Sequence, residues 1–249
     1  MTGDADIAKV GALIADPARA RILLALGDGR SLPATVLASE AGVSPSTTSA
    51  HLGKLVDGSL LTVHQQGRHR YYRLPGPAVG EALEKLMTLA PEAPVRSLRQ
   101  GTRANAVRSA RTCYDHLAGM LGAGLMAAML ERGLLTGGDG TFTPGEDGGD
   151  RLSAAGREHR YELTDRGHAE LTAFGLDLEA LTRLRRPLIR YCVDWSEQRH
   201  HLAGALGAAI AERTLELGWI TRARRGRAVH VTDAGREGLR EAFGLQLAA

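Results

Sequence analysis

The stretch from Val43 to Leu74 constrains the fold of this chain more than any other part of the sequence. Ser44-Pro45 places a capping hydroxyl before a proline, which is a common start of a helix. The segment that follows is rich in small hydroxyl residues and carries Leu52 and Leu55 on one helical face. Gln66-Gly67-Arg68 then supplies the turn of a predicted basic β-hairpin. This order is the layout of a helix that enters the DNA major groove with a wing beside it.

The outward face of this helix and the tip of the hairpin form the predicted DNA-contacting surface. Small side chains let a helix backbone approach base edges closely, and hydroxyl groups can bond either bases or phosphates. An arginine at a hairpin tip suits the minor groove or a phosphate. The alternative is an ordinary solvated hairpin. The residues expected to contact DNA are Ser44, Ser46, Thr47, Ser49, Ala50, His51, Lys54, Gln66, Arg68 and Arg70.

Local charge supports nucleic-acid binding better than bulk charge does. The formal net charge of the 249-residue chain is only +3, but residues 44–74 carry Lys54, Arg68, Arg70 and Arg73 against the single acid Asp57. There is no apolar run long enough for a membrane span, and the first residues lack the order of a signal peptide. We therefore expect a cytoplasmic protein with no membrane partner.

Three segments, DPARARILLAL, SPSTTSAHLGKL and GRHRYYRL, resemble the winged helix-turn-helix of ArsR/SmtB-type repressors over about residues 5–90. The resemblance implies a homodimer formed through the first and last helices, here about residues 4–14 and 77–89. It also implies one recognition helix per half-site of a double-stranded operator, ~34 Å apart. Family members often carry a histidine at the position of Ala50, so this chain departs from the pattern there.

The metal sites for which that family is known are missing. The helix before the recognition helix reads PATVLASEA and has no Cys-x-Cys. The last helix supplies Glu81 and Glu84 but no histidine, and carboxylates alone make a poor site for zinc or a softer metal. From the sequence we assign no metal ligand and no cofactor.

Beyond a proline-containing boundary at residues 91–94, the chain repeats itself. HLAGMLG at 116–122 returns as HLAGALG at 201–207, and ERGLLT at 131–136 as ELGWIT at 216–221. Each copy is predicted to contain a helix, a hairpin and a helix, a small winged-helix-like unit. The predicted organisation is a DNA-binding and dimerisation domain at 1–90, a linker at 91–100, and a duplicated effector-binding domain at 101–249. The two copies cover about 103–178 and 183–247.

The residues leading into each copy are chemically unusual, because both segments present Arg, an aromatic residue, Cys, Asp and His. Cys113 and His116 lie three residues apart, which predicts that they share a helix face. The segments could line a pocket for an organic effector, converge on a thiophilic metal ion, or form ordinary buried contacts. The assigned effector-binding residues are Arg111, Cys113, Tyr114, His116, Arg190, Cys192, Asp194, Trp195, His200 and His201.

The sequence therefore predicts a mainly α protein with small β-hairpins (α+β), in which a winged helix-turn-helix precedes a duplicated winged-helix-like domain. The predicted function is a dimeric repressor whose operator binding is controlled by a small-molecule effector. One alternative is a thiol- or metal-responsive repressor that uses Cys113 and Cys192 with neighbouring histidines. Another is an architectural DNA-binding protein without an effector. No catalytic residue is assigned, because no GxSxG, P-loop or HExxH string occurs.

Overall fold

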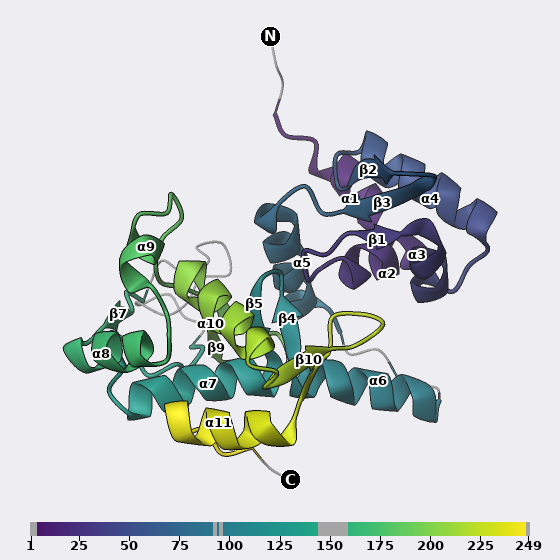
Figure 1. Ribbon diagram of the computed structural model, residues 1–249. Coiled ribbons are helices and arrows are strands. Elements are labelled where there is room, and N and C mark those ends of the chain that lie inside the picture. The colour runs from purple at the N-terminus through teal and green to yellow at the C-terminus, as the bar shows by residue number, and fades with distance from the viewer. Residues whose placement is uncertain (1–3, 92–93, 95–96, 144–158, 248–249) are drawn as a thin grey trace. The chain divides into compact units, whose positions relative to one another are not determined.

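The computed structural model describes residues 4–91, 94, 97–143 and 159–247 (Figure 1). The chain divides into two compact units. The first unit comprises Met1–Leu83 together with Arg224–Arg227, and the second comprises Glu84–Ala223 and Ala228–Ala249. Each unit has its own hydrophobic core.

The first unit is a small helical domain with one three-stranded antiparallel sheet in the order β1-β3-β2. Leu23, Leu37 and Leu55 come from three different helices and meet in its core. Its elements are α1 (Ile7–Ile14), α2 (Pro17–Ala25), β1 (Leu32–Pro33), α3 (Ala34–Ala41), α4 (Pro45–Asp57), β2 (Thr62–Gln66), β3 (His69–Arg73) and the beginning of α5 (Pro77–Leu89).

Local signals in the sequence explain the helix boundaries of this unit. The Asp16 carboxylate accepts hydrogen bonds from the backbone N–H groups of Ala18 and Arg19 at the start of α2. Ser44 caps α4 in the same way, through the N–H of Thr47. Gly42 ends α3 in the left-handed conformation that glycine adopts without strain. The predicted helix-turn-helix and wing are confirmed.

The second unit contains the two copies predicted from the repeat. Helix, hairpin and helix follow in the predicted order, but in each copy a further two-stranded hairpin precedes the first of these helices. After α6 (Leu98–Ser109), copy one comprises β4 (Arg111–Cys113), β5 (His116–Ala118), α7 (Gly119–Glu131), β6 (Leu135–Thr136), β7 (Glu162–Leu163) and α8 (Asp165–Ala173). After α9 (Leu178–Thr182), copy two comprises β8 (Arg190–Val193), β9 (His200–Ala203), α10 (Gly204–Glu216), β10 (Ile220–Arg222), β11 (Val229–Val231) and α11 (Asp233–Phe243). The insertion between β6 and β7 falls mostly at residues 144–158, outside the described residues.

The prediction that Cys113 and His116 share a helix face is wrong. Cys113 is the last residue of β4 and His116 the first residue of β5, and the two face each other across a two-residue turn. Tyr114 in that turn has φ of 58°, so the backbone reverses direction there. The helix that was expected to include this segment begins only at Gly119.

The two copies interlock through their leading hairpins. Strand β5 contacts β9, while α7 packs against β9 and α10 packs against β5. Glycine is required at the same position of each helix. A Cβ atom on Gly122 would lie 2.4 Å from the Leu117 carbonyl oxygen, and one on Gly207 would lie 2.6 Å from the Leu202 carbonyl oxygen. The two copies therefore make equivalent contacts between the helix of one copy and the hairpin of the other.

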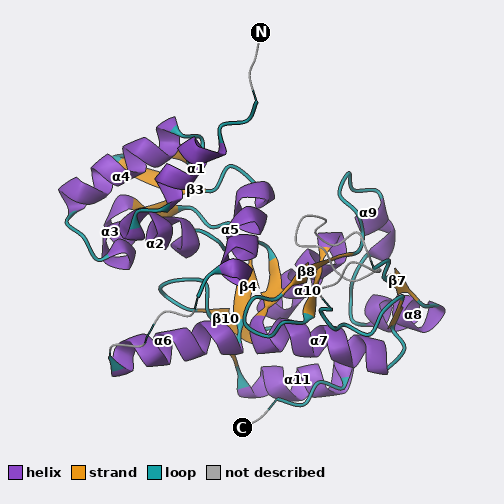
Figure 2. Ribbon diagram, turned by 180° about the vertical axis from the view of Figure 1, so that it is seen from behind, coloured by secondary structure: helices purple, strands orange, loops and turns teal. Residues whose placement is uncertain are grey.

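Short strand pairs are enclosed by helices in the second unit (Figure 2). The apolar side chains of α7 and α10, among them Leu121, Met126, Leu206 and Ile210, form the middle of its core. Among the residues that the structure describes, no helix is both long and apolar enough to cross a membrane.

Candidate functional site

The predicted DNA-contacting residues of α4 fall on its exposed face. Ser46, Thr47, Ser49, Ala50 and Lys54 are exposed. The opposite side of the helix buries Leu52 and Leu55 in the core, so the orientation predicted from the helical pattern is confirmed. This face offers hydroxyls, a methyl group and one cation to a partner.

Two residues of the predicted set also have structural roles. Ser44 is exposed, but its hydroxyl caps the helix and lies 2.8 Å from the hydroxyl of Thr47. His51 is half-buried, and its Nδ1 lies 3.9 Å from Oδ1 of Asp16. The Ser44 side chain is therefore partly committed to capping α4, and His51 to a contact with the residue that caps α2.

The wing is a regular antiparallel hairpin. Strand β2 pairs with β3 from Thr62–Arg73 to Gln66–His69, and Gly67 at the tip has φ of 59°. Arg68 and Arg70 are exposed, as is Gln66. The rings of His64 and Tyr71 stack across the strands with centroids 5.6 Å apart, a contact that sequence reasoning did not predict. The wing therefore carries three exposed guanidinium groups, because Arg73 at the end of β3 is exposed as well.

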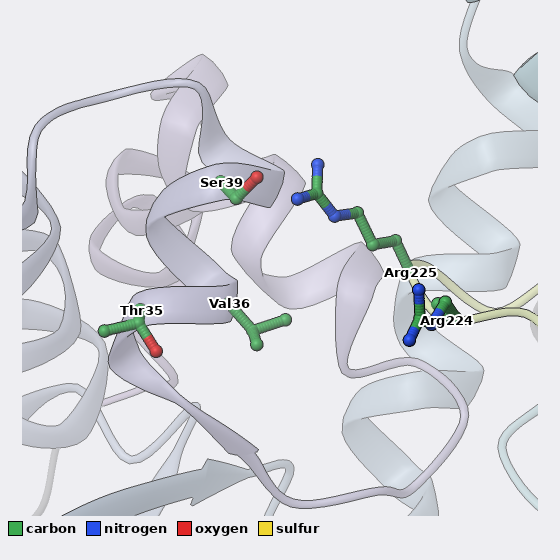
Figure 3. A pocket seen from close by; sticks show the side chains of 5 residues that line it. All are labelled: Thr35, Val36, Ser39, Arg224 and Arg225. Atoms are coloured by element: carbon green, nitrogen blue, oxygen red, sulfur yellow. The ribbon is translucent and has the colours of Figure 1, made fainter.

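A pocket of about 320 Å³ lies elsewhere in the first unit. It is lined by Thr35, Val36, Ser39, Arg224 and Arg225 (Figure 3). None of the site residues predicted from the sequence lines it.

The second unit brings two cysteines and two histidines together. Cys113 faces His116 across the β4–β5 pair, and Cys192 faces His201 across the β8–β9 pair. One ligand atom from each of the four residues lies within 4.8 Å of all the others. Both thiols are free, and the two imidazole rings lie 5.2 Å apart between centroids. This group of four residues is called the Cys/His cluster below.

Each histidine of the Cys/His cluster has a carboxylate beside its Nδ1 atom. His116 Nδ1 lies 3.2 Å from Oδ1 of Asp115, and His201 Nδ1 lies 3.2 Å from Oδ2 of Asp194. Burial opposes protonation of His201, but the contact with Asp194 outweighs burial and raises the pKa of His201 to about 9. Sequence reasoning left Asp115 out of the assigned set. The Cys-x-Asp spacing common to both copies was the available signal.

Asp194 is the most heavily bonded residue near the cluster. It accepts hydrogen bonds from Nη2 of Arg111 at 2.8 Å and from the Gly119 backbone N–H at 2.7 Å. The backbone N–H and hydroxyl of Ser196 also donate to it. Burial would raise the pKa of this carboxyl, but His201 and Arg111 hold it far below its usual range. A guanidinium of copy one therefore fixes the carboxylate that orients a histidine of copy two.

The thiols differ in their ionisation. The side-chain contact with Cys113 is the main reason that the pKa of Cys192 is well below its usual range, and the two histidines lower it further. The pKa of Cys113 is correspondingly raised by its contact with Cys192 and by burial. The cluster therefore favours one thiolate beside one thiol.

The remaining predicted effector residues are not part of the Cys/His cluster. The Trp195 ring lies 4.6 Å from the Arg111 guanidinium carbon, a cation–π contact. His200 precedes His201 on β9, so its side chain points to the opposite face of the strand. Its Nδ1 lies 2.7 Å from the Tyr161 hydroxyl oxygen. Tyr114 is half-buried in the β4–β5 turn, and Arg190 is half-buried on β8. The structure thus brings together only part of the predicted set: the four residues of the cluster, with Asp194, Arg111 and Trp195 beside them.

Comparison with known proteins connects both units to one kind of protein. A helix-turn-helix domain model matches residues 14–64. The chain is 39% identical over 231 residues to "Uncharacterized HTH-type transcriptional regulator YdfF" of Bacillus subtilis (strain 168), covering 93% of this chain and 94% of that protein. It is 37% identical over 81 residues to the HTH-type transcriptional regulator CmtR of Mycobacterium bovis, covering 32% of this chain and 68% of CmtR.

Solved structures resemble the N-terminal part of the chain. The NMR structure of the cadmium metal-sensor CMTR from Mycobacterium tuberculosis is 33% identical, with a TM-score of 0.29. The match covers 37% of this chain and 99% of that chain. The homodimeric winged helix-turn-helix DNA-binding domain Mb0332 from Mycobacterium bovis is 28% identical, with a TM-score of 0.31. It covers 36% of this chain and 89% of its own.

Proposed function

Because the chain belongs to the ArsR/SmtB-type family of helix-turn-helix transcriptional regulators, we propose that α4 and the β2–β3 wing are the surfaces with which it binds operator DNA. The observation that carries this assignment is the exposed face of α4. Its core side is fixed by Leu52 and Leu55, and its free side presents only small or polar residues. Such a surface can approach base edges, while Arg68 on the wing can reach a phosphate or the minor groove.

The operator-bound form is proposed to be a homodimer. Helix α1 has no buried residue, and its Ile7 and Val10 side chains are 83% and 41% exposed. On α5, Leu86 and Leu89 are also exposed. Exposed apolar residues on the two helices that the family resemblance assigns to the dimer interface support this arrangement. Two copies of α4 would then read two half-sites about one DNA turn, ~34 Å, apart.

The C-terminal unit is proposed to control operator binding. Its relative YdfF is similar over both units, so the second unit belongs with the regulator rather than being an unrelated attachment. A ligand of this unit can change DNA binding only if its affinity differs between DNA-compatible and DNA-incompatible dimers. We assign no reaction to the chain, since its relatives are transcriptional regulators.

Introducing a charge on α4 tests the proposed DNA surface. The Ala50→Glu variant adds a carboxylate to the exposed face while keeping a good helix former. Its matched control is Ala169→Glu, at an exposed alanine on α8. Duplexes selected from a random pool by the wild-type protein are titrated by fluorescence anisotropy. We expect Ala50→Glu to lose at least ~10-fold in affinity, about 1.4 kcal/mol, with Ala169→Glu unchanged. Equal affinity of the two variants would refute the assignment.

A further inference from the structure

We propose that the Cys/His cluster binds one divalent thiophilic metal ion, Zn²⁺ in the first instance, in a closed four-coordinate site that joins the two copies. The ligands are Cys113, His116, Cys192 and His201. This proposal departs from the assignment made from the sequence, which contained no metal ligand. It concerns the second unit alone and does not depend on how the chain binds DNA.

The number, type and spacing of the ligand atoms match a tetrahedral site. All four atoms lie within 4.8 Å of one another. Zn–S bonds of ≈ 2.3 Å and Zn–N bonds of ≈ 2.0–2.1 Å place neighbouring ligands of a tetrahedron about 3.3–3.8 Å apart. A contraction of roughly 1 Å in the widest pair therefore converts the cluster into a coordination shell. Two thiolates with two imidazoles is an established ligand set for zinc.

The histidines are already oriented as metal ligands. Nδ1 of each ring faces a carboxylate, Asp115 for His116 and Asp194 for His201. Nε2 of each ring is buried and has no hydrogen-bond partner within the described part of the chain. A buried polar atom without a partner is costly, and a metal ion would relieve both atoms at once. A carboxylate behind a ligating histidine is the usual outer support of a zinc site.

The charges of the cluster suit a divalent cation. His116 is 4% exposed and His201 is fully buried, so an uncompensated charge among them would be costly. A bound ion would displace the protons of both thiols and of the ligating imidazole nitrogens, so that two thiolates neutralise its two charges and the imidazoles add none. A monovalent ion or an anion would leave net charge in this interior.

The arrangement is closed, because it offers four protein ligands from two pairs of strands. Structural zinc sites have four protein ligands, whereas catalytic sites keep one position for water. Each copy supplies one cysteine and one histidine, so neither copy holds a complete site. The ion therefore ties the β4–β5 pair to the β8–β9 pair. Its binding free energy stabilises the contact between copies.

Titration of the full-length protein with Co²⁺ tests the proposal. The protein is purified under reducing conditions, stripped with a chelator and titrated with Co²⁺ as a spectroscopic probe for Zn²⁺. The chain has 2 cysteines, both in the cluster, so any thiolate-to-cobalt absorption reports on this site. We expect one equivalent of Co²⁺ with the intense visible bands of tetrahedral coordination, and displacement of these bands by Zn²⁺. A reduced wild-type protein that develops no such bands would overturn the proposal.

Substitutions of the proposed ligands test where the ion binds. Cys192→Ser and His116→Ala are expected to lose the tetrahedral spectrum and at least ~100-fold in Zn²⁺ affinity, or ~2.7 kcal/mol. The control is His168→Ala, which removes an exposed histidine on α8. Circular dichroism of the stripped proteins distinguishes lost ligation from lost folding. If a ligand variant unfolds, the wild-type titration still tests the proposal through the number of Co²⁺ ions bound and the thiolate-to-cobalt absorption. Unchanged binding by a folded Cys192→Ser, or a Cys113–Cys192 disulfide that persists in excess reductant, would also overturn the proposal.

Discussion

Asp194 of copy two and Arg111 of copy one form a buried ion pair, with 2.8 Å between Oδ1 and Nη2 and no solvent exposure of either side chain. Glu84 approaches the same guanidinium at 3.6 Å, and the Trp195 ring covers it. The contact joins the first strand of one copy, β4, to the turn between β8 and β9 of the other. The pair therefore links the two halves of the second unit independently of any bound ion.

Removing the charge of Asp194 should destabilise the second unit. We expect Asp194→Asn to lower the free energy of unfolding by about 3 kcal/mol or more, because Arg111 keeps a buried charge with a weakened partner. Urea unfolding followed by tryptophan fluorescence measures this free energy, since Trp195 and Trp219 both lie in the second unit. The control Glu179→Gln breaks an exposed pair with Arg183 and should cost less than about 1 kcal/mol. Similar losses in both variants would contradict a special role for the buried pair.

The equivalence of the two copies predicts equivalent sensitivity to substitution. Gly122→Ala and Gly207→Ala each push a methyl group into a carbonyl of the preceding strand, so each should cost about 1–3 kcal/mol. Gly124→Ala, on the same helix as Gly122, meets only the end of the Leu245 side chain at 3.1 Å. It should be tolerated, because alanine favours the helix. Thermal unfolding compares the three variants, and a harmless Gly207→Ala would contradict the pseudo-symmetric packing.

Asp115 should position His116 for metal binding without touching the metal. We expect Asp115→Asn to weaken Zn²⁺ binding by about 10–100-fold, in competition with a chromophoric chelator. The variant should keep the tetrahedral Co²⁺ spectrum, because all four ligands remain. Asp139→Asn, an exposed carboxylate of the same unit, is the control. Full affinity in Asp115→Asn would show that the carboxylate does not support the ligand.

The Asp16 cap should make the first unit sensitive to acid. Hydrogen bonding from the Arg19 backbone N–H lowers the pKa of Asp16 below 3.8, despite the opposing effect of desolvation. The charged form is thus favoured in the folded state, so the stabilisation is present above the unfolded pKa and is lost as pH falls through the folded pKa. Asp16→Ala should lower the Tm at neutral pH, and its difference from wild type should shrink below pH 3.8. Circular dichroism melts measure both effects, with Asp4→Ala as the control. A difference that stays constant into acid would refute the assignment.

The fold of the first unit was predictable because its signals are local. A capping serine before Pro45 fixed the start of α4, and a glycine at the hairpin tip fixed the wing. Burial of Leu52 and Leu55 then determined which face of the helix remains free. Each of these features depends on residues within a few positions of one another, so no knowledge of the tertiary structure was needed.

The Cys/His cluster was only partly predictable. A spacing of three residues suits a helix face as well as the two ends of a tight turn, and the positive φ of Tyr114 that decides between them leaves no sequence signal. The support of Asp115 by Arg186, 2.5 Å away, joins residues 71 positions apart. Such a partner depends on how the copies interlock. The repeat indicated that the cysteines were equivalent, but their convergence required the structure.

The salt dependence of DNA affinity tests the central claim, that α4 and the wing form the DNA-binding surface, most directly. The slope of log K against log salt is measured for the wild type, for Arg68→Gln and for Arg183→Gln, which removes an exposed cation from α9's end in the second unit. We expect the wild type to bind with a steep negative slope. Arg68→Gln should weaken binding and reduce the slope by about one for each wing that touches a phosphate, whereas Arg183→Gln should match the wild type. An unchanged slope and affinity in Arg68→Gln, together with a loss in Arg183→Gln, would contradict the account.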